Sequence, residues 1–143
     1  MRKALTNWRL LDALWLLMLA AYVLAGVSLV PLHGDEPTQI YMARDYYTWF
    51  VEGHPDQLGY QAWETLDGDA ATRQDLRLKD GTIARLLYGF AAYLNGFGPE
   101  DLNNQWAWGS GWEWNHANGH VPSDALLNSA RTASWRSRMS VIA

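Results

Sequence analysis

The stretch that decides the predicted fold is ALWLLMLAAYVLAGVSLVPL, residues 13–32, followed at once by HGDEP, residues 33–37. The first stretch has no charged residue. As a helix it reaches about 30 Å, the thickness of the hydrocarbon core of a bilayer. Two arginines and a lysine lie within residues 1–9. The pattern therefore predicts a basic cytoplasmic lead over 1–9 and a transmembrane helix over 10–32.

A cleaved secretory signal peptide is the alternative interpretation of this segment. Its lead would be residues 1–10, and Val23-Leu24-Ala25 would be its cleavage site. However, the apolar run continues through residues 27–32, beyond that site. It also exceeds the roughly 7–15 apolar residues typical of a signal peptide. The sequence therefore favours a retained membrane helix.

Charge is distributed unevenly along the chain. Residues 33–130 hold fourteen Asp and Glu against five Lys and Arg, and the last thirteen residues add three arginines and no acid. With the basic residues ahead of the apolar run, residues 33–122 are expected on the outer face of the cell membrane. The acidic balance argues against a nucleic-acid partner, which needs a basic surface. The absence of cysteine removes disulfides, thiolate metal sites and thiol nucleophiles.

The chain is predicted to be mainly α-helical. Two amphipathic juxtamembrane helices are expected over 37–51 and 82–95, because apolar residues recur in both at spacings of three and four. Gly53 and Gly96 are their predicted stops, and Gly89 indicates close packing against another backbone. The apolar stripes consist of Ile40, Ala43, Tyr47, Phe50 and Val51 in the first helix, and of Ile83, Leu86, Leu87, Phe90 and Leu94 in the second.

A further helix is predicted near the end of the chain. Ser123-Asp124 caps a helix that starts around Ala125 and continues to residue 143, as the truncated start of a second membrane helix over 123–143. Arg136 and Arg138 conflict with this assignment, because arginine inside a bilayer is costly. Residues 54–80 contain no long apolar run and are predicted to form a structured loop.

Residues 97–122 form a second predicted loop, rich in glycine, asparagine and tryptophan. Its tryptophans either belong to an interfacial aromatic belt or stack on sugars, and the belt is favoured. His116 and His120 are four residues apart, as zinc ligands on a helix are, but the neighbouring Gly119 and Pro122 favour a polar loop. The tryptophans are Trp106, Trp108, Trp112 and Trp114.

The order of these features resembles the N-terminal part of a GT-C glycosyltransferase. It is most similar to the group of protein-O-mannosyltransferases and aminoarabinose transferases. The resemblance covers almost the whole chain but only the first quarter or so of such an enzyme. The matching residues are His33-Gly34-Asp35-Glu36, Tyr41-Met42-Ala43-Arg44-Asp45, Leu76-Arg77-Leu78-Lys79-Asp80-Gly81-Thr82-Ile83, Leu87-Tyr88-Gly89, Gly111-Trp112-Glu113, Gly119-His120-Val121-Pro122 and Ala130-Arg131.

The resemblance implies transfer of a sugar from a polyprenyl-phosphate donor to an acceptor on the outer face of the membrane. Asp35 would be the general base and Glu36 an orienting or second acid, since a low-dielectric cleft raises the pKa of a carboxyl toward the working pH. Lys79 or Arg85 would meet the carrier phosphate. The other residues of the matched motifs that would contact substrate are Arg44, Trp112 and His120.

The remaining membrane helices of a full-length enzyme would be partners of this chain, which alone is expected to be inactive. The donor lipid is expected as a substrate, no cofactor is identified, and a divalent metal is left open.

Asp67-Gly68-Asp69 resembles the metal motif of soluble sugar transferases, but a turn is the favoured interpretation. Asp35-Glu36 could equally be a helix cap. The alternative function is a single-pass anchored module that binds a glycan or a protein through its Trp-rich loop.

Overall fold

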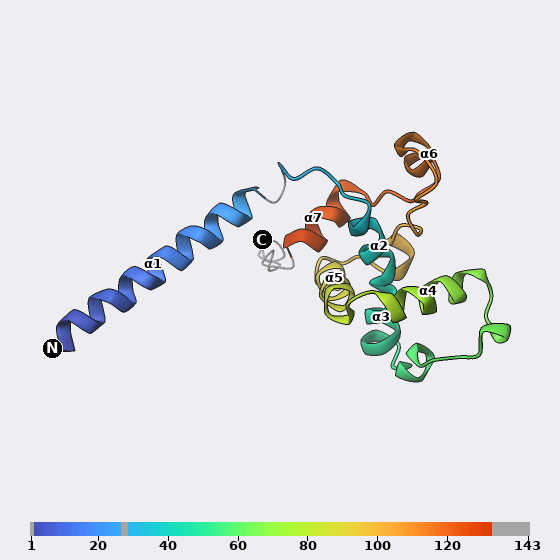
Figure 1. Cartoon of the computed structure of the whole chain (residues 1–143), viewed down its shortest axis with the longest axis horizontal. Helices are drawn as coiled ribbons and strands as arrows, with labels where there is room; N and C mark the ends of the chain where they lie inside the picture. Colours follow the sequence, from blue (N-terminus) through green and yellow to red (C-terminus); the bar gives the residue numbers. More distant parts are fainter. Residues whose placement is uncertain (1, 27–28, 133–143) are drawn as a thin grey trace, which may run out of the picture. The chain divides into compact units, whose positions relative to one another are not determined.

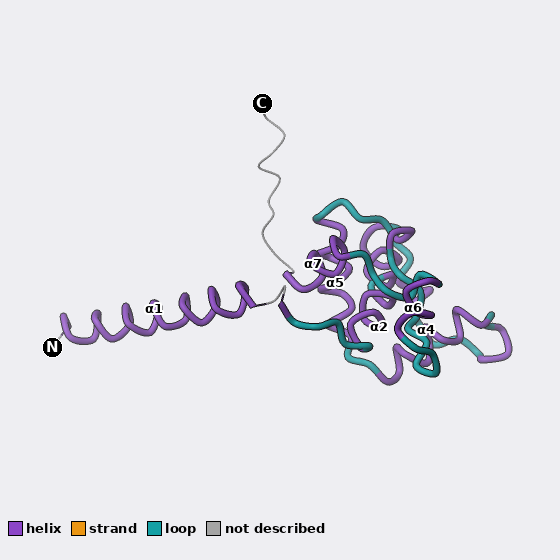
Figure 2. Tube along the Cα trace, turned by 90° about the horizontal axis from the view of Figure 1, so that it is seen from above, coloured by secondary structure: helices purple, strands orange, loops and turns teal. Residues whose placement is uncertain are grey.

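A computed structural model describes residues 2–26 and 29–132 of the chain. The chain divides into two compact units, residues 1–31 and residues 32–143, which we describe separately. The described residues are mainly helical and include no strand, which agrees with the predicted helical class (Figures 1 and 2).

The first unit is the single helix α1, Arg2–Gly26. Among the described residues, no helix combines the length and the apolar character needed to cross a bilayer. The predicted integral membrane fold, with a transmembrane helix over 10–32, is therefore wrong. The first eleven residues of the helix include Arg2, Lys3, Arg9 and Asp12. Its uncharged part, residues 13–26, is about 21 Å long, short of the roughly 30 Å of a bilayer core.

The second unit begins with a helical segment over residues 35–51. It comprises α2 (Asp35–Met42), α3 (Arg44–Tyr46) and the π-helical turn η2 (Tyr47–Val51). It starts two residues earlier than predicted, because Gly34 is the N-cap. Both acidic residues thus lie in the first turn, where they face the positive end of the helix dipole.

Helix α5, Thr82–Leu94, packs against α2, α3 and α7. It begins at the predicted residue and ends one residue before the predicted end, but its buried face differs from the prediction. Gly89, Ala91 and Ala92 are buried, whereas the predicted stripe is largely exposed, with 74% of Ile83 open to solvent. The helix packs through its small residues because a neighbouring helix comes very close. A Cβ built on Gly89 would lie 2.3 Å from the Cβ of Tyr46, as the predicted close packing requires.

The predicted loop over 54–80 contains the unpredicted helix α4, Gly68–Lys79. Asp67 is its N-cap, and its Oδ1 accepts a hydrogen bond from the backbone N–H of Ala70 at 2.7 Å. The Asp-Gly-Asp motif is therefore a helix start rather than the favoured turn. Two short 3-10 helices, η3 (Pro55–Leu58) and η4 (Trp63–Thr65), precede it.

The remaining described elements are η5 (Pro99–Asp101), α6 (Trp112–Ala117) and α7 (Asp124–Thr132). Helix α7 begins near the predicted position, and the Oγ of Ser123 accepts a hydrogen bond from the N–H of Leu126 at 3.2 Å. The predicted continuation of this helix over 133–143, including both of its arginines, lies outside the described residues.

The apolar core of the second unit lies between α2, η2, α5 and α7. Small residues of α5 and α7 allow the helices to approach, and larger side chains of α2 and the loop after α5 fill the space between them. Tyr46, Tyr88, Phe97 and Leu127 cover the edges of this core. The buried members are Ile40, Ala43, Tyr47, Ala92, Leu102, Leu126 and Ala130.

Candidate functional site

Asp35 stands at the exposed N-terminus of α2. Its side chain is 72% exposed, and its Oδ2 lies 3.2 Å from Nδ1 of His33, which is equally exposed. The backbone N–H of Asp35 donates to the same ring nitrogen at 3.3 Å. This carboxylate therefore lies in solvent, and the described residues do not form the low-dielectric cleft expected around it.

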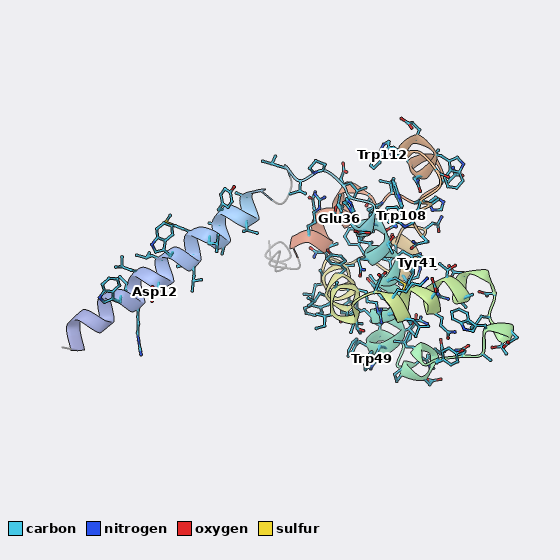
Figure 3. All side chains as sticks on the ribbon, viewed as in Figure 1. Asp12, Glu36, Tyr41, Trp49, Trp108 and Trp112 are labelled. Carbon is cyan, nitrogen blue, oxygen red and sulfur yellow. The ribbon has the colours of Figure 1, made fainter. Side chains whose placement is uncertain are left out.

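The Trp-rich loop packs directly against this helix start. A Cβ built on Gly34 would lie 2.8 Å from Cη2 of Trp108 and 3.1 Å from Nε1 of Trp106. The ring of Trp106 also lies 6.1 Å from that of Trp112. Trp108 remains 61% and Trp112 48% exposed. We call Asp35 and these three indoles the Trp–Asp surface; Figure 3 shows the indole of Trp108 close to the start of α2.

Asn115, which is fully buried, holds the loop in place. Its Oδ1 accepts from the N–H of Ala107 at 2.9 Å, and its Nδ2 donates to the carbonyls of Ala107, Ser110 and Gly111. One side chain thus fixes the segment between Trp106 and Trp112 to α6. The indoles are therefore presented on a rigid backbone, which reduces the entropy lost on binding.

A second set of polar contacts fixes the loop to α2. Nδ2 of Asn103 donates to the carbonyl of Pro37 at 2.9 Å, and Nε2 of Gln105 donates to Oγ1 of Thr38 at 3.2 Å. His120, a predicted substrate contact, forms a short hydrogen bond from its Nδ1 to the carbonyl of Gln105 and stacks on Trp114. The structure therefore gives His120 a role in supporting the loop.

Glu36 is engaged elsewhere. Arg131 donates two hydrogen bonds of 2.7 Å to its carboxylate, from Nε and Nη2. The backbone N–H of His33 donates a third, at 3.1 Å. Burial raises the pKa of the Glu36 carboxyl, but the bonds from Arg131 and His33 outweigh burial, and the pKa lies below its usual value. Glu36 therefore connects α2 to α7, while Asp35 faces solvent.

The three predicted cationic contacts lie apart from Asp35. Arg44 donates to the carbonyls of Tyr41, Leu102 and Asn103 at 3.0–3.1 Å. Arg85 is buried, with its Nε 3.1 Å from Oδ2 of Asp45. Lys79 is exposed and pairs with Asp75 one helical turn away. The structure therefore brings the Trp-rich loop to Gly34, next to Asp35 in the sequence, while these cations contact other groups.

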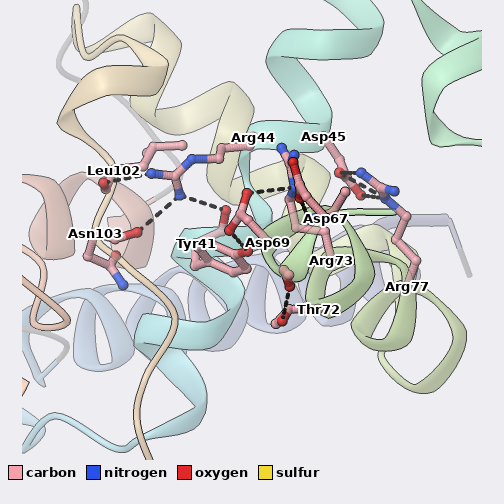
Figure 4. A network of polar contacts seen from close by, with 12 residues as sticks. Tyr41, Arg44, Asp45, Asp67, Asp69, Thr72, Arg73, Arg77, Leu102 and Asn103 are labelled. Carbon is pink, nitrogen blue, oxygen red and sulfur yellow. Dashed lines mark hydrogen bonds and ion pairs between the residues drawn. The ribbon is translucent and has the colours of Figure 1, made fainter. Parts of the chain in front are cut away.

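Sequence reasoning missed a polar network between α2, α3 and α4 (Figure 4). Asp45, only 2% exposed, pairs with Arg77 at 2.7 Å and with Arg85 at 3.1 Å. Asp69 accepts a hydrogen bond from the Tyr41 hydroxyl. Burial and this neighbouring carboxylate raise the pKa of Tyr41. Asp69 and Arg77 come from the unpredicted helix α4, and Arg85 comes from α5.

Comparison of the chain with protein-family models, curated proteins and solved structures gave no match.

Proposed function

We propose that this chain binds a carbohydrate at the Trp–Asp surface and that Asp35 is the general base in transfer of a glycosyl group from a polyprenyl-phosphate donor. The observation that carries the proposal is the solvent-exposed Asp35 carboxylate next in sequence to Gly34, on which the exposed Trp108 and the partly buried Trp106 pack. The resemblance to GT-C glycosyltransferases supports the reaction type.

The chemistry of the surface suits a sugar. An indole ring offers a broad apolar face to the C–H groups of a pyranose, and its N–H remains available to a hydroxyl group. A carboxylate accepts hydrogen bonds from sugar hydroxyls. Aromatic side chains together with a few fixed polar groups are the usual contacts of small-molecule ligands. Trp108, Trp112 and Asp35 provide this combination.

In the proposed reaction, the acceptor hydroxyl attacks C1 of the donor sugar. A bond forms between the acceptor oxygen and C1, and the bond from C1 to the phosphate oxygen breaks. The electron pair leaves with the polyprenyl phosphate, and the acceptor proton passes to the Asp35 carboxylate. Asp35 suits this role better than Glu36, since both oxygens of Glu36 accept hydrogen bonds from Arg131.

A second candidate function is carbohydrate binding without transfer. It is favoured by the positions of Arg44, Arg85 and Lys79, which contact other groups and lie apart from Asp35. A donor phosphate at Asp35 would therefore need a cation other than these three. In this case Asp35 would only accept hydrogen bonds from the bound sugar.

Two assays separate these functions. The first measures binding of mannobiose, cellobiose and diacetylchitobiose by calorimetry. We expect W108A and W112A to lower the affinity about tenfold each, as expected for loss of a stacked ring. Trp63, 42% exposed on η4, provides the matched control W63A, which should bind as wild type. Equal binding by all variants would rule out the Trp–Asp surface as the sugar site.

The second assay measures transfer of radiolabelled mannose from polyprenyl-phosphate mannose by a full-length enzyme that contains this chain, because the chain alone is expected to be inactive. D35N should retain sugar binding and lose transfer, because the amide cannot accept the proton. Transfer by D35N at the wild-type rate would refute the role of Asp35 as base. Sugar binding without transfer by the wild type would instead support the second candidate.

A further inference from the structure

A cavity of about 230 Å³ lies against α4 in the second unit, apart from the residues of the Trp–Asp surface. Residues of η2, η3, the segment before η4 and α4 form its walls. Most of these side chains are polar, whereas an ordinary packing defect is lined by apolar groups. The polar lining residues are Thr48, Gln57, Gln61, Arg73, Gln74 and Arg77.

The wall of this cavity is fixed by internal hydrogen bonds. Gln74 is buried, and its Oε1 accepts from the backbone N–H of Gln61 at 2.8 Å. Its Nε2 donates to the carbonyl of the same residue at 2.9 Å. This pair of bonds holds the segment before η4 against α4. The cavity is therefore formed before any ligand arrives, which favours binding.

Two guanidinium groups, Arg73 and Arg77, line the cavity one helical turn apart on α4 (Figure 4). The side chain of Arg77 is anchored by Asp45. Nε of Arg73 lies 3.3 Å from Oδ2 of Asp69, yet this buried nitrogen makes no hydrogen bond within the described part of the chain. Arg73 is therefore less fully engaged than Arg77, which donates three hydrogen bonds to Asp45, and the Arg73 side chain is 28% exposed.

The charge around the cavity favours an anion. Two guanidinium groups and no carboxylate are among the residues that line the cavity, and each guanidinium pairs with one carboxylate, Arg73 with Asp69 and Arg77 with Asp45. Lys79 and Asp75, on the same helix, neutralise each other. Arginine is the side chain best suited to phosphate and carboxylate groups, because its planar fork matches their oxygens.

We propose that this cavity binds an acidic monosaccharide, with its phosphate or carboxylate at Arg73 and Arg77. The neutral side chains Thr48, Gln57 and Gln61 surround the remaining space and offer both donors and acceptors to sugar hydroxyls. The inference is independent of the Trp–Asp surface, since it involves neither Asp35 nor the indoles.

Calorimetry with glucose 6-phosphate, glucuronate, inorganic phosphate and glucose tests this proposal. We expect both acidic sugars to bind more tightly than glucose, because glucose lacks the charged group. Comparison of glucose 6-phosphate with glucuronate identifies the acid, and inorganic phosphate measures the contribution of the anion alone. If neither acidic sugar binds at about 10 mM, the proposal is wrong, since even a millimolar site would be detected there.

Variants of the lining residues test whether the ligand binds in this cavity. R73Q should weaken binding at least about tenfold, because it removes a charge-assisted hydrogen bond. K79Q, on the exposed side of the same helix, should bind as wild type. Because R73Q also loses the contact with Asp69, Q57A provides a second test, and it should weaken binding of glucose 6-phosphate more than binding of phosphate. Wild-type affinity in both variants would place the ligand elsewhere.

Discussion

Arg131 and Glu36 lie 95 positions apart in the sequence and join through two hydrogen bonds of 2.7 Å. The arginine side chain is 9% exposed and the carboxylate 21%. The pair ties the start of α2 to the last described turn of α7. The pair also explains why two adjacent acidic side chains differ in solvent exposure, since Arg131 holds Glu36 against α7 and Asp35 remains in solvent.

We expect R131M to destabilise the second unit by about 1–3 kcal/mol, because the partly buried Glu36 carboxylate loses its partner. The effect should depend on pH. The folded pKa of Glu36 lies below its ordinary value of 4.5, so the pair stabilises the fold above that pH. The stabilisation is lost as the pH falls through the folded pKa. Urea unfolding of R131M and wild type at neutral and strongly acidic pH measures the difference, which should shrink in acid.

D35N is the control for this pair, because the side chain of Asp35 is 72% exposed at the adjacent position. Its stability should stay within about 0.5 kcal/mol of wild type at neutral pH. A stability difference between R131M and wild type that is the same at both pH values would contradict the role given to Glu36.

Within the polar network, we expect substitution of Asp45 to cause the largest loss of stability. It is 2% exposed and is the carboxylate partner of both Arg77 and Arg85. D45N leaves these guanidinium groups without their buried counter-charge, which costs about 3–5 kcal/mol. D75N removes an exposed partner on α4 and should change stability by no more than about 1 kcal/mol. Chemical denaturation compares the two variants, and equal losses would mean that burial of Asp45 has no energetic consequence.

The sequence predicted those parts of the fold that have local patterns. The bounds of α5 and the stop after Leu94 follow from apolar spacing and from Gly96, whose φ of 83° suits glycine. Helix α4 was missed because its sequence, GDAATRQDLRLK, offers little apolar periodicity, although Asp67 is a recognisable N-cap. The transmembrane assignment failed because it treated the apolar run separately from the basic residues that share its helix.

The orientation of α5 and the composition of the site had no local pattern to reveal them. Hydrophobicity placed Ile83 and Leu87 inside, but the tight approach of Tyr46 to Gly89 selects the face with small residues. Asp35 and Trp112 could each be singled out from the sequence. The contact of the Trp-rich loop with Gly34 connects distant parts of the chain, and no spacing rule predicts it.

A substitution at Gly89 tests whether the close approach of Tyr46 determines which face of α5 is buried. In G89A the new Cβ would lie 2.3 Å from the Cβ of Tyr46 and 2.7 Å from the carbonyl oxygen of Ala43, so the helices must move apart. We expect a loss of about 1–3 kcal/mol, even though alanine is the better helix former. G68A is the control, because a Cβ at Gly68 in α4 meets nothing within 4 Å. It should be neutral or slightly stabilising. Thermal unfolding compares the stability of G89A with that of G68A. A larger loss of stability in G68A than in G89A would contradict the close packing.

Asn115 provides a test that connects the fold to the proposed carbohydrate site. N115A removes a fully buried amide that makes four hydrogen bonds to the backbone of residues 107–111. We expect a loss of about 1–3 kcal/mol, because the backbone groups it satisfied stay partly buried.

The variant also releases the segment that separates Trp106 from Trp112, while all three indoles of the Trp–Asp surface remain in the chain. If a rigid arrangement of these rings creates the site, N115A should weaken disaccharide binding in calorimetry about as much as W108A does. The matched control is N118A, which loses an exposed side-chain bond to the carbonyl of Trp114 and should bind as wild type. Full binding by N115A would mean that the rings act singly, without the frame that Asn115 provides.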